Sequence, residues 1–255
     1  MKHFRFSRSF AAALLLAPFF GASSWAQVAP APSAPATGAT AATTDGAAPA
    51  PLVKVDFNAQ KGIFSGDATL APGLDGTALT LKGTGSAELA EKLDTAKSFS
   101  VMAWVKVTRA GGFQTFISSD GPTNSAFFLQ MRDDTKRFAF TALPEGPDVG
   151  AQANAKEDAK IGVWTHLAGV HDAQKHTLTL YVNGVLQEAV PFEATYTAPG
   201  PLRVGRAKFG ENPVDFAVGQ IDDAQIFQAA LTAPQVMTLV QPLLAKAAAA
   251  PATPK

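Results

Sequence analysis

Apolar and polar residues alternate along two neighbouring segments in the middle of the chain. Trp164 to Val170 and Leu178 to Val185 place β-branched, aromatic and aliphatic residues at alternate positions, a pattern typical of β-strands. Within the second segment, Asn183-Gly184 supplies the positive φ angles that a two-residue hairpin turn requires. The pattern therefore predicts antiparallel β structure in this part of the chain.

Similar short apolar segments recur through the body of the chain, separated by clusters of Gly, Pro, Asp and Asn. We predict about eleven strands from them. They are Leu52 to Phe57, Ala78 to Lys82, Phe99 to Val107, Phe113 to Ser118, Ala126 to Arg132, Arg137 to Ala142, Trp164 to His171, Thr177 to Val182, Gln187 to Phe192, Leu202 to Val204 and Val218 to Phe227.

The spacing of these strands favours an all-β fold made of two antiparallel sheets packed face to face, a jelly-roll sandwich. In Phe99 to Val107 the alternate residues Phe, Val, Ala, Val and Val mark one face as core. Long connections are expected near Asp67 to Asp75 and Leu143 to Ile161. Glu88 and Glu91 are expected in a turn or short helix.

A single C-terminal helix is predicted from about residue 232. Thr232 and Gln235 form a capping box, and Pro234 lies in the first turn, where its missing N–H costs little. Apolar residues then recur at helical spacing, and Pro242 is expected to kink or end the helix near Gln241. We expect the apolar stripe to pack on the sandwich; a helix that binds a partner is the alternative.

Several motifs carry a resemblance to a known family. They are "WTHLAGVHD" from Trp164, "LYVNG" from Leu180, "LRVG" from Leu202, "GQIDDAQIF" from Gly219 and "LTAPQV" from Leu231. With them the segment from about Leu52 to Leu239 resembles the laminin G-like, concanavalin A-like jelly-roll family. The resemblance implies the fold rather than an activity, since that family includes sugar-binding modules, adhesion domains and glycan-cleaving enzymes.

The N-terminal residues 1–26 read as a signal peptide. Lys2, Arg5 and Arg8 precede an apolar stretch from Phe10 to Phe20, and Ser24-Trp25-Ala26 offers small residues for cleavage after Ala26. The stretch is too short to span a bilayer readily, and no cysteine follows it for lipid attachment. We therefore expect a periplasmic or secreted protein without a membrane span after cleavage.

Composition divides the remaining chain into a body and two tails. Residues 27–51 are rich in Ala, Pro and Thr and predict a disordered linker, and 247–255 a disordered tail. The chain has no cysteine and so no disulfides. The body, 52–241, is long enough to bury a core without them. After signal removal the net charge is about −3, and the scattered Lys and Arg residues argue against nucleic-acid binding.

The sequence offers little support for catalysis. A retaining glycan hydrolase needs two carboxylates on one face, and no Glu-x-Asp-x-x-Glu pattern is present. His166 and His171 differ by an odd number of positions, so they are poorly placed for a shared zinc site on one strand. No nucleophile stands in a recognisable elbow. We therefore expect a protein that is not an enzyme.

Calcium suits the chain better than zinc, because Asp222 and Asp223 offer hard oxygen ligands. Members of the family that the chain resembles hold a structural calcium, some through an acidic residue of the last long strand, which implies the same role for this pair. The alternative is that one aspartate binds a loop backbone while the other is solvated.

Sugar binding requires aromatic faces with polar groups around them. Trp104 and Trp164 lie in strongly apolar strands and are expected in the core. The candidate ligand-binding residues lie in loops and are Phe113, Tyr196, Phe209, Arg206 and Asn212, with Asn124 as a further partner.

Three functions remain open at this stage. The first is a carbohydrate- or glycoconjugate-binding module whose partner is a glycan. The second is a structural or adhesion domain whose partner is a cell-envelope protein. The third, a glycan hydrolase, is the least supported by the residues.

Overall fold

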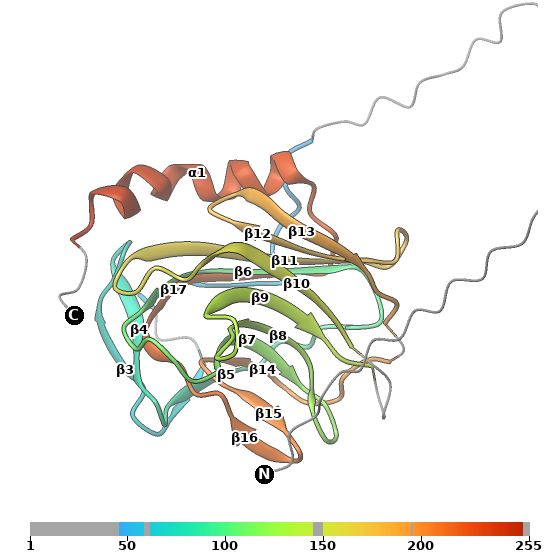
Figure 1. The fold of residues 1–255 in the computed structure, drawn as a ribbon, viewed down its shortest axis with the longest axis horizontal. Helices are drawn as coiled ribbons and strands as arrows, with labels where there is room; N and C mark the ends of the chain where they lie inside the picture. The colour runs from blue at the N-terminus through green and yellow to red at the C-terminus, as the bar shows by residue number, and fades with distance from the viewer. Residues whose placement is uncertain (1–45, 59–61, 145–149, 195, 252–255) are drawn as a thin grey trace, which may run out of the picture. The chain divides into compact units, whose positions relative to one another are not determined.

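The computed structural model describes residues 46–58, 62–144, 150–194 and 196–251. Two antiparallel sheets pack face to face and one C-terminal helix lies outside them (Figure 1). The predicted all-β sandwich with a C-terminal helix is therefore confirmed.

The first sheet has the strand order β13-β12-β11-β6-β17-β4-β3, with β1 paired to β17. Its strands are β1 (Val53–Val55), β3 (Thr69–Pro72), β4 (Thr77–Lys82), β6 (Phe99–Val107), β11 (Trp164–Asp172), β12 (Thr177–Val182), β13 (Val185–Pro191) and β17 (Val218–Phe227). The predicted turn at Asn183-Gly184 joins β12 to β13, and both residues have positive φ, 50° and 77°.

The second sheet has the order β10-β9-β8-β7-β14-β5-β2. Its strands are β2 (Ile63–Ser65), β5 (Ser86–Leu89), β7 (Gln114–Asp120), β8 (Ser125–Met131), β9 (Arg137–Ala142), β10 (Ala151–Asp158) and β14 (Leu202–Val204). A separate two-stranded ribbon, β15 (Ala207–Phe209) and β16 (Asn212–Val214), follows β14 in the chain.

Six of these strands were not among those expected from the sequence. They are β2, β3, β5, β10, β15 and β16. The expectation of long open connections was therefore wrong, because β3 lies within 67–75 and β10 within 143–161. Glu88 likewise lies in strand β5 rather than in a turn or short helix.

The core between the sheets is rich in phenylalanine. The rings of Phe99 and Phe127 lie 5.1 Å apart, and Phe140 packs against both. Alternate residues of β6 face this core, as predicted. The opposite face of β6 is also buried, and there Trp104 is 1% exposed; Trp164 of β11 is 6% exposed, so the prediction of core tryptophans is confirmed.

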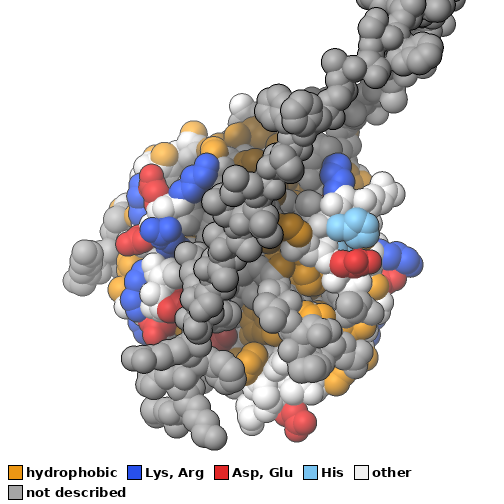
Figure 2. Space-filling view, turned by 45° about the vertical axis from the view of Figure 1, so that its right-hand side comes forward, with side chains coloured by type: hydrophobic (Ala, Val, Ile, Leu, Met, Phe, Trp, Pro, Cys, Tyr) orange, Lys and Arg blue, Asp and Glu red, His pale blue; other side chains and the backbone are white. Residues whose placement is uncertain are grey.

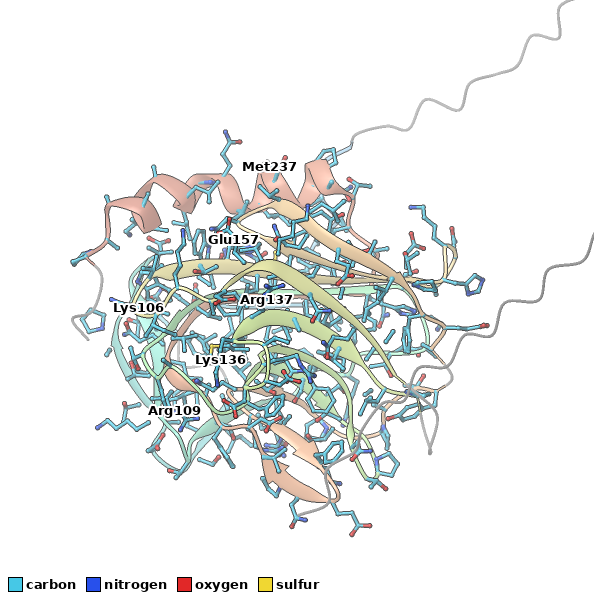
Figure 3. The ribbon with its side chains drawn as sticks, viewed as in Figure 1. Lys106, Arg109, Lys136, Arg137, Glu157 and Met237 are labelled. Atoms are coloured by element: carbon cyan, nitrogen blue, oxygen red, sulfur yellow. The ribbon has the colours of Figure 1, made fainter. Side chains whose placement is uncertain are left out.

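Helix α1 (Ala233–Ala249) explains the burial of this second face (Figure 1). The predicted capping box is present, since Thr232 Oγ1 accepts from Gln235 N and Gln235 Oε1 accepts from Thr232 N. Val236 and Val240 pack on the outer side of the first sheet. Met237, labelled in Figure 3, approaches the β12–β13 turn. The prediction that the apolar stripe packs on the sandwich is confirmed.

Pro242 was predicted to kink or end the helix near Gln241, and the second of these outcomes was wrong. The helix passes Pro242 and continues to Ala249, and Ala247 is buried against the sheet. Residues 247–249 of the expected tail therefore belong to the helix, because packing of the last turns offsets the lost helical hydrogen bond. Residues 252–255 lie outside the described residues.

The predicted signal peptide 1–26 and most of the predicted linker, 27–45, also lie outside the described residues. From Gly46 to Pro51 the chain has no helix or strand. Gln235 Nε2 of α1 donates to Gly46 O at 3.3 Å, and Ala48 packs beside the first turn of the helix. No helix in the described part of the chain is long and apolar enough to cross a membrane.

Side chains of the first sheet cover the free edge of the second. Glu188 Oε2 accepts from Asn154 N at 2.6 Å, and Gln187 Oε1 accepts from Lys156 N at 3.1 Å. Both acceptors come from β13 and both donors from β10, which are the outermost strands of their sheets. The backbone of the β10 edge is thus partly satisfied from across the sandwich.

Gly169 of β11 is a position where the core leaves no room for a side chain. A Cβ there would lie 2.5 Å from Cγ of Phe140. We predict that Gly169→Ala lowers the free energy of unfolding by about 1–3 kcal/mol, the usual cost of overpacking. Urea denaturation measures it. In a Phe140→Leu background the same substitution should cost less, because the ring is gone, and an equal cost in both backgrounds would contradict the steric explanation.

Candidate functional site

The β15–β16 ribbon lies against the outer face of the second sheet and forms one wall of a cleft of about 360 Å³. We call this the aromatic cleft. It is lined by residues of β8, β9, the ribbon and four loops, namely Phe113, Phe128, Gln130, Arg132, Thr141, Leu143, Phe209, Val214 and Asp215.

The floor of the cleft arises from strand alternation. In β8, Phe127 and Leu129 face the core while Phe128 and Gln130 face the cleft. Gln130 Nε2 donates to Thr141 Oγ1 of β9 at 2.9 Å. Thr141 Oγ1 in turn donates to Gln152 Oε1 of β10 at 3.2 Å. A connected polar row therefore crosses three strands beneath the aromatic walls.

Phe113 and Phe209, two of the residues predicted from the sequence, lie on this cleft although 96 positions separate them. Phe113 is 36% exposed and Phe209 57% exposed. Arg132 lies over the ring of Phe113, with its Cζ 5.1 Å from the centroid. Arg132 also donates to Asp134 Oδ1 at 2.9 Å and to Gln152 Oε1, so its guanidinium is held in place.

Arg206 takes a different position from the one predicted. It is 8% exposed and does not line the cleft, because its guanidinium pairs with Asp120 through two hydrogen bonds of 3.1 and 2.8 Å. Asp120 also accepts from Arg203, which pairs with Glu88. This chain of charges fixes the start of the ribbon to the second sheet. Arg206 therefore positions the wall of the cleft.

The remaining predicted residues lie around the ribbon or away from it. Asn212 is exposed at the start of β16, and its Nδ2 donates to Gly210 O at 2.7 Å. Asn124 Oδ1 accepts from Gly210 N at 2.9 Å and so holds the ribbon tip. Tyr196 lines a separate hollow of about 10 Å³ beside Phe99 and Thr95. The structure thus places Tyr196 apart from Phe113 and Phe209.

Asp215 was not singled out from the sequence, yet its carboxylate lies at the wall of the cleft. It follows β16, has a φ of 55°, and its carbonyl oxygen accepts from Thr115 N at 2.8 Å. Burial raises the pKa of the Asp215 carboxyl, and the nearby charge of Arg132 partly offsets this rise. The sequence signal was weak, because a lone aspartate in a turn usually binds local backbone.

The chemistry available in the cleft is that of binding. Its aromatic faces suit the C–H surface of a sugar ring, and its amide, hydroxyl and carboxylate groups suit hydroxyls. Among the described residues that line it, Asp215 alone carries a carboxylate. A hydrolase of the two-carboxylate type needs a second one within about 5–10 Å across the bond.

The aspartates predicted to hold calcium are engaged by hydrogen-bond donors and a cation. Asp222 is fully buried, with Oδ2 accepting from Asp75 N at 2.9 Å and Oδ1 from Asp223 N at 2.8 Å. Asp223, in a bulge of β17 with a φ of 45°, pairs with Lys54 at 3.0 Å. Backbone N–H groups and an ammonium surround these oxygens where calcium needs acceptors, so this arrangement does not fit a calcium site.

A second hollow of about 350 Å³ lies at the edge of the sandwich, between β10 and the β12–β13 turn. We call this the edge groove. Val185 and Leu186 are 57% and 48% exposed there, and charged residues including Glu157, labelled in Figure 3, line the opposite side. On the face that Figure 2 shows, Lys and Arg lie interspersed with Asp and Glu.

Comparison with known proteins identifies the superfamily and the fold. A family model described as the concanavalin A-like lectin/glucanases superfamily matches residues 81–237. The comparison with curated proteins returned no match.

Among solved structures, one similar chain is domain 4 of an extracellular GH43 arabinanase from Geobacillus stearothermophilus, in complex with arabinotriose. It has 23% identity and a TM-score of 0.62, and the match covers 75% of this chain and 98% of that one. The binding domain of botulinum neurotoxin serotype G has 12% identity and a TM-score of 0.58, covering 75% and 51% of the two chains. A heptameric SAP-like pentraxin from Limulus polyphemus has 17% identity and a TM-score of 0.55, covering 67% and 84%. These likenesses confirm the fold.

The buried Asp222 generates a prediction about pH. Burial raises the pKa of Asp222 from 3.8 to about 6, which corresponds to about 3 kcal/mol. Because the folded state holds this proton more tightly than the unfolded state, the stabilising effect is complete below about pH 4 and is lost as pH rises through about 6. We expect the Asp222→Asn protein to lack this decrease in the free energy of unfolding with rising pH. Urea denaturation of both proteins from pH 4 to 7 tests this, and parallel stability profiles would contradict it.

Proposed function

The chain belongs to the concanavalin A-like lectin/glucanases superfamily, and from this premise we propose that it is an exported, non-catalytic module that binds a glycan in the aromatic cleft. The observation that carries the proposal is that Phe113 and Phe209 line one cleft that has a polar floor. The two rings come from distant parts of the chain and remain partly exposed in one hollow. Exposed aromatic residues beside fixed polar groups are the usual means of holding a sugar ring.

The likeness to solved structures supports this class of ligand. The similar arabinanase domain was solved with arabinotriose, and a botulinum neurotoxin binding domain of the same fold was solved in complex with SialylT. Because the identities are low, the ligand of this chain is inferred from the residues of its own cleft.

The proposal of a non-catalytic role rests on the residues of the cleft. Asp215 lacks a second carboxylate among the described lining residues. Gln130 and Thr141, which line the same cleft, are an amide and a hydroxyl joined by a hydrogen bond. These groups bind and orient, but they do not supply the acid and base that glycoside hydrolysis requires.

A protein partner is a second candidate function, favoured by the edge groove. Val185 and Leu186 are exposed apolar residues at the start of β13 that line the edge groove, and exposed apolar side chains suit protein contacts better than sugar hydroxyls. In this alternative the domain would attach to a cell-envelope protein.

The glycan proposal predicts that binding depends on the two phenylalanines. A glycan array probed with the full chain should show specific binding, and Phe113→Ala or Phe209→Ala should weaken it about tenfold or more, since an aromatic contact contributes about 1.5 kcal/mol. The array is run with calcium and again with chelator, which also tests the calcium predicted from the sequence.

Ile63→Ala is the matched control, because Ile63 is 71% exposed but lies on β2 at the far edge of the sheet. It should leave binding unchanged. An array without any bound glycan, or equal losses in the control, would overturn the proposal. Loss of binding in Val185→Ala or Leu186→Ala variants, tested against cell-envelope proteins, would favour the alternative.

The proposed export can be tested separately. Expressed in a bacterium that has a periplasm, the chain should be recovered from that compartment with Gln27 as its first residue, as read by intact-mass measurement. Ala26→Phe removes the small residue before the cut and should leave the precursor uncut. Recovery of the full-length wild type from the cytoplasm would contradict export.

A further inference from the structure

Asp215 is the feature of the aromatic cleft that glycan binding in general does not explain. Its carboxylate lines the cleft, and in the described part of the chain it has no hydrogen bond or ion pair to a neighbouring group. Aspartates elsewhere in the body differ: Asp67, Asp94 and Asp172 all accept from nearby donors. A carboxylate that is half-buried without a donor is poorly solvated, and burial raises its pKa accordingly.

Arg132 does not form an ion pair with the Asp215 carboxylate, because other groups already hold its guanidinium. Arg132 is the one cationic residue among the described residues that line the cleft. Its guanidinium already pairs with Asp134 and stacks over Phe113, and it donates to Gln152. Since Arg132 pairs with Asp134 and acts on Asp215 only through its charge, the Asp215 carboxylate has no cation in direct contact within the described part of the chain.

The aromatic walls of the cleft also favour a ligand that carries a positive charge. Phe128 and Phe209 line it with the carboxylate, and aromatic faces attract cations through their ring quadrupoles. A neutral sugar would use the rings and the polar floor but would leave Asp215 bonded at most to a hydroxyl. A sugar with a protonated amino group would gain a charge-assisted hydrogen bond as well. A uronic or sialic acid would bring a second negative charge to the same wall.

We propose, building on the proposed glycan-binding function, that the aromatic cleft selects glycans with free amino groups and that the sugar ammonium pairs with the Asp215 carboxylate. Phe113 and Phe209 bind the flat face of the ring in any accepted glycan. Asp215 determines which glycans are preferred.

Isothermal titration of the full chain with three sets of short oligomers at pH 7 tests the proposal. The probes are glucosamine oligomers, their N-acetylated counterparts of equal length, and galacturonic acid oligomers. We expect the free amine to bind at least about tenfold more tightly than the acetylated form, since a charge-assisted hydrogen bond is worth about 1.5–3 kcal/mol in proteins, and the acid to bind weakest.

Asp215→Asn should abolish the preference while binding of the N-acetylated oligomers persists. Asparagine keeps the shape and tolerates the positive φ of 55° at this position, so the variant is expected to fold. Asp158→Asn is the matched control, because this aspartate is exposed beside Arg137 outside the cleft and the charge change is the same. It should leave the preference unchanged.

The outcomes separate this inference from the function on which it rests. Equal binding of amine and acetylated oligomers, or a preference for the acid, would overturn the selectivity and leave glycan binding standing. Loss of preference in Asp158→Asn as well would mean that overall charge, rather than Asp215, is responsible. Absence of binding to these probes and to a general glycan array would overturn both.

Discussion

Each sheet of the sandwich has an outer face as well as an inner one, and the structure depends on how these two outer faces are covered. The first sheet carries Trp104 and Trp164 outward, side chains too apolar to face water, and α1 buries them. The second sheet carries polar residues outward, and the β15–β16 ribbon covers part of them while Arg206 and Asp120 hold it there. Covering the outer faces therefore gives a closed apolar layer on the first sheet and a cleft on the second.

The aromatic cleft is made from parts of the fold that are stable for other reasons. The Gln130–Thr141–Gln152 row lies on strands whose opposite side chains build the core, so the floor inherits the rigidity of the sandwich. The walls belong to a loop and a ribbon, which are held by side-chain hydrogen bonds and an ion pair. Substitutions at Arg206 or Asn124 would thus act on the cleft through the position of Phe209.

The sequence predicted the layers of this fold better than its details. Strands such as Phe99–Val107 and the Asn183-Gly184 turn carry strong local signals, and so does the Thr232 cap. Strand β10 was missed because its inward residues are alanines, which have low strand propensity although they alternate correctly with Gln152 and Asn154. At the site, Phe113 and Phe209 were predictable as loop aromatics. Asp215 and Gln130 were not, because only the pairing of distant strands brings them together.

The contacts of Glu188 and Gln187 with β10 bear on how the molecule behaves among copies of itself. An outermost strand with open amides invites the same strand of a neighbouring molecule to add on, which leads to fibres or precipitates. In this chain two side chains occupy amides that such an intruding strand would need. The two contacts therefore make the β10 edge a poorer template for a strand of a neighbouring copy.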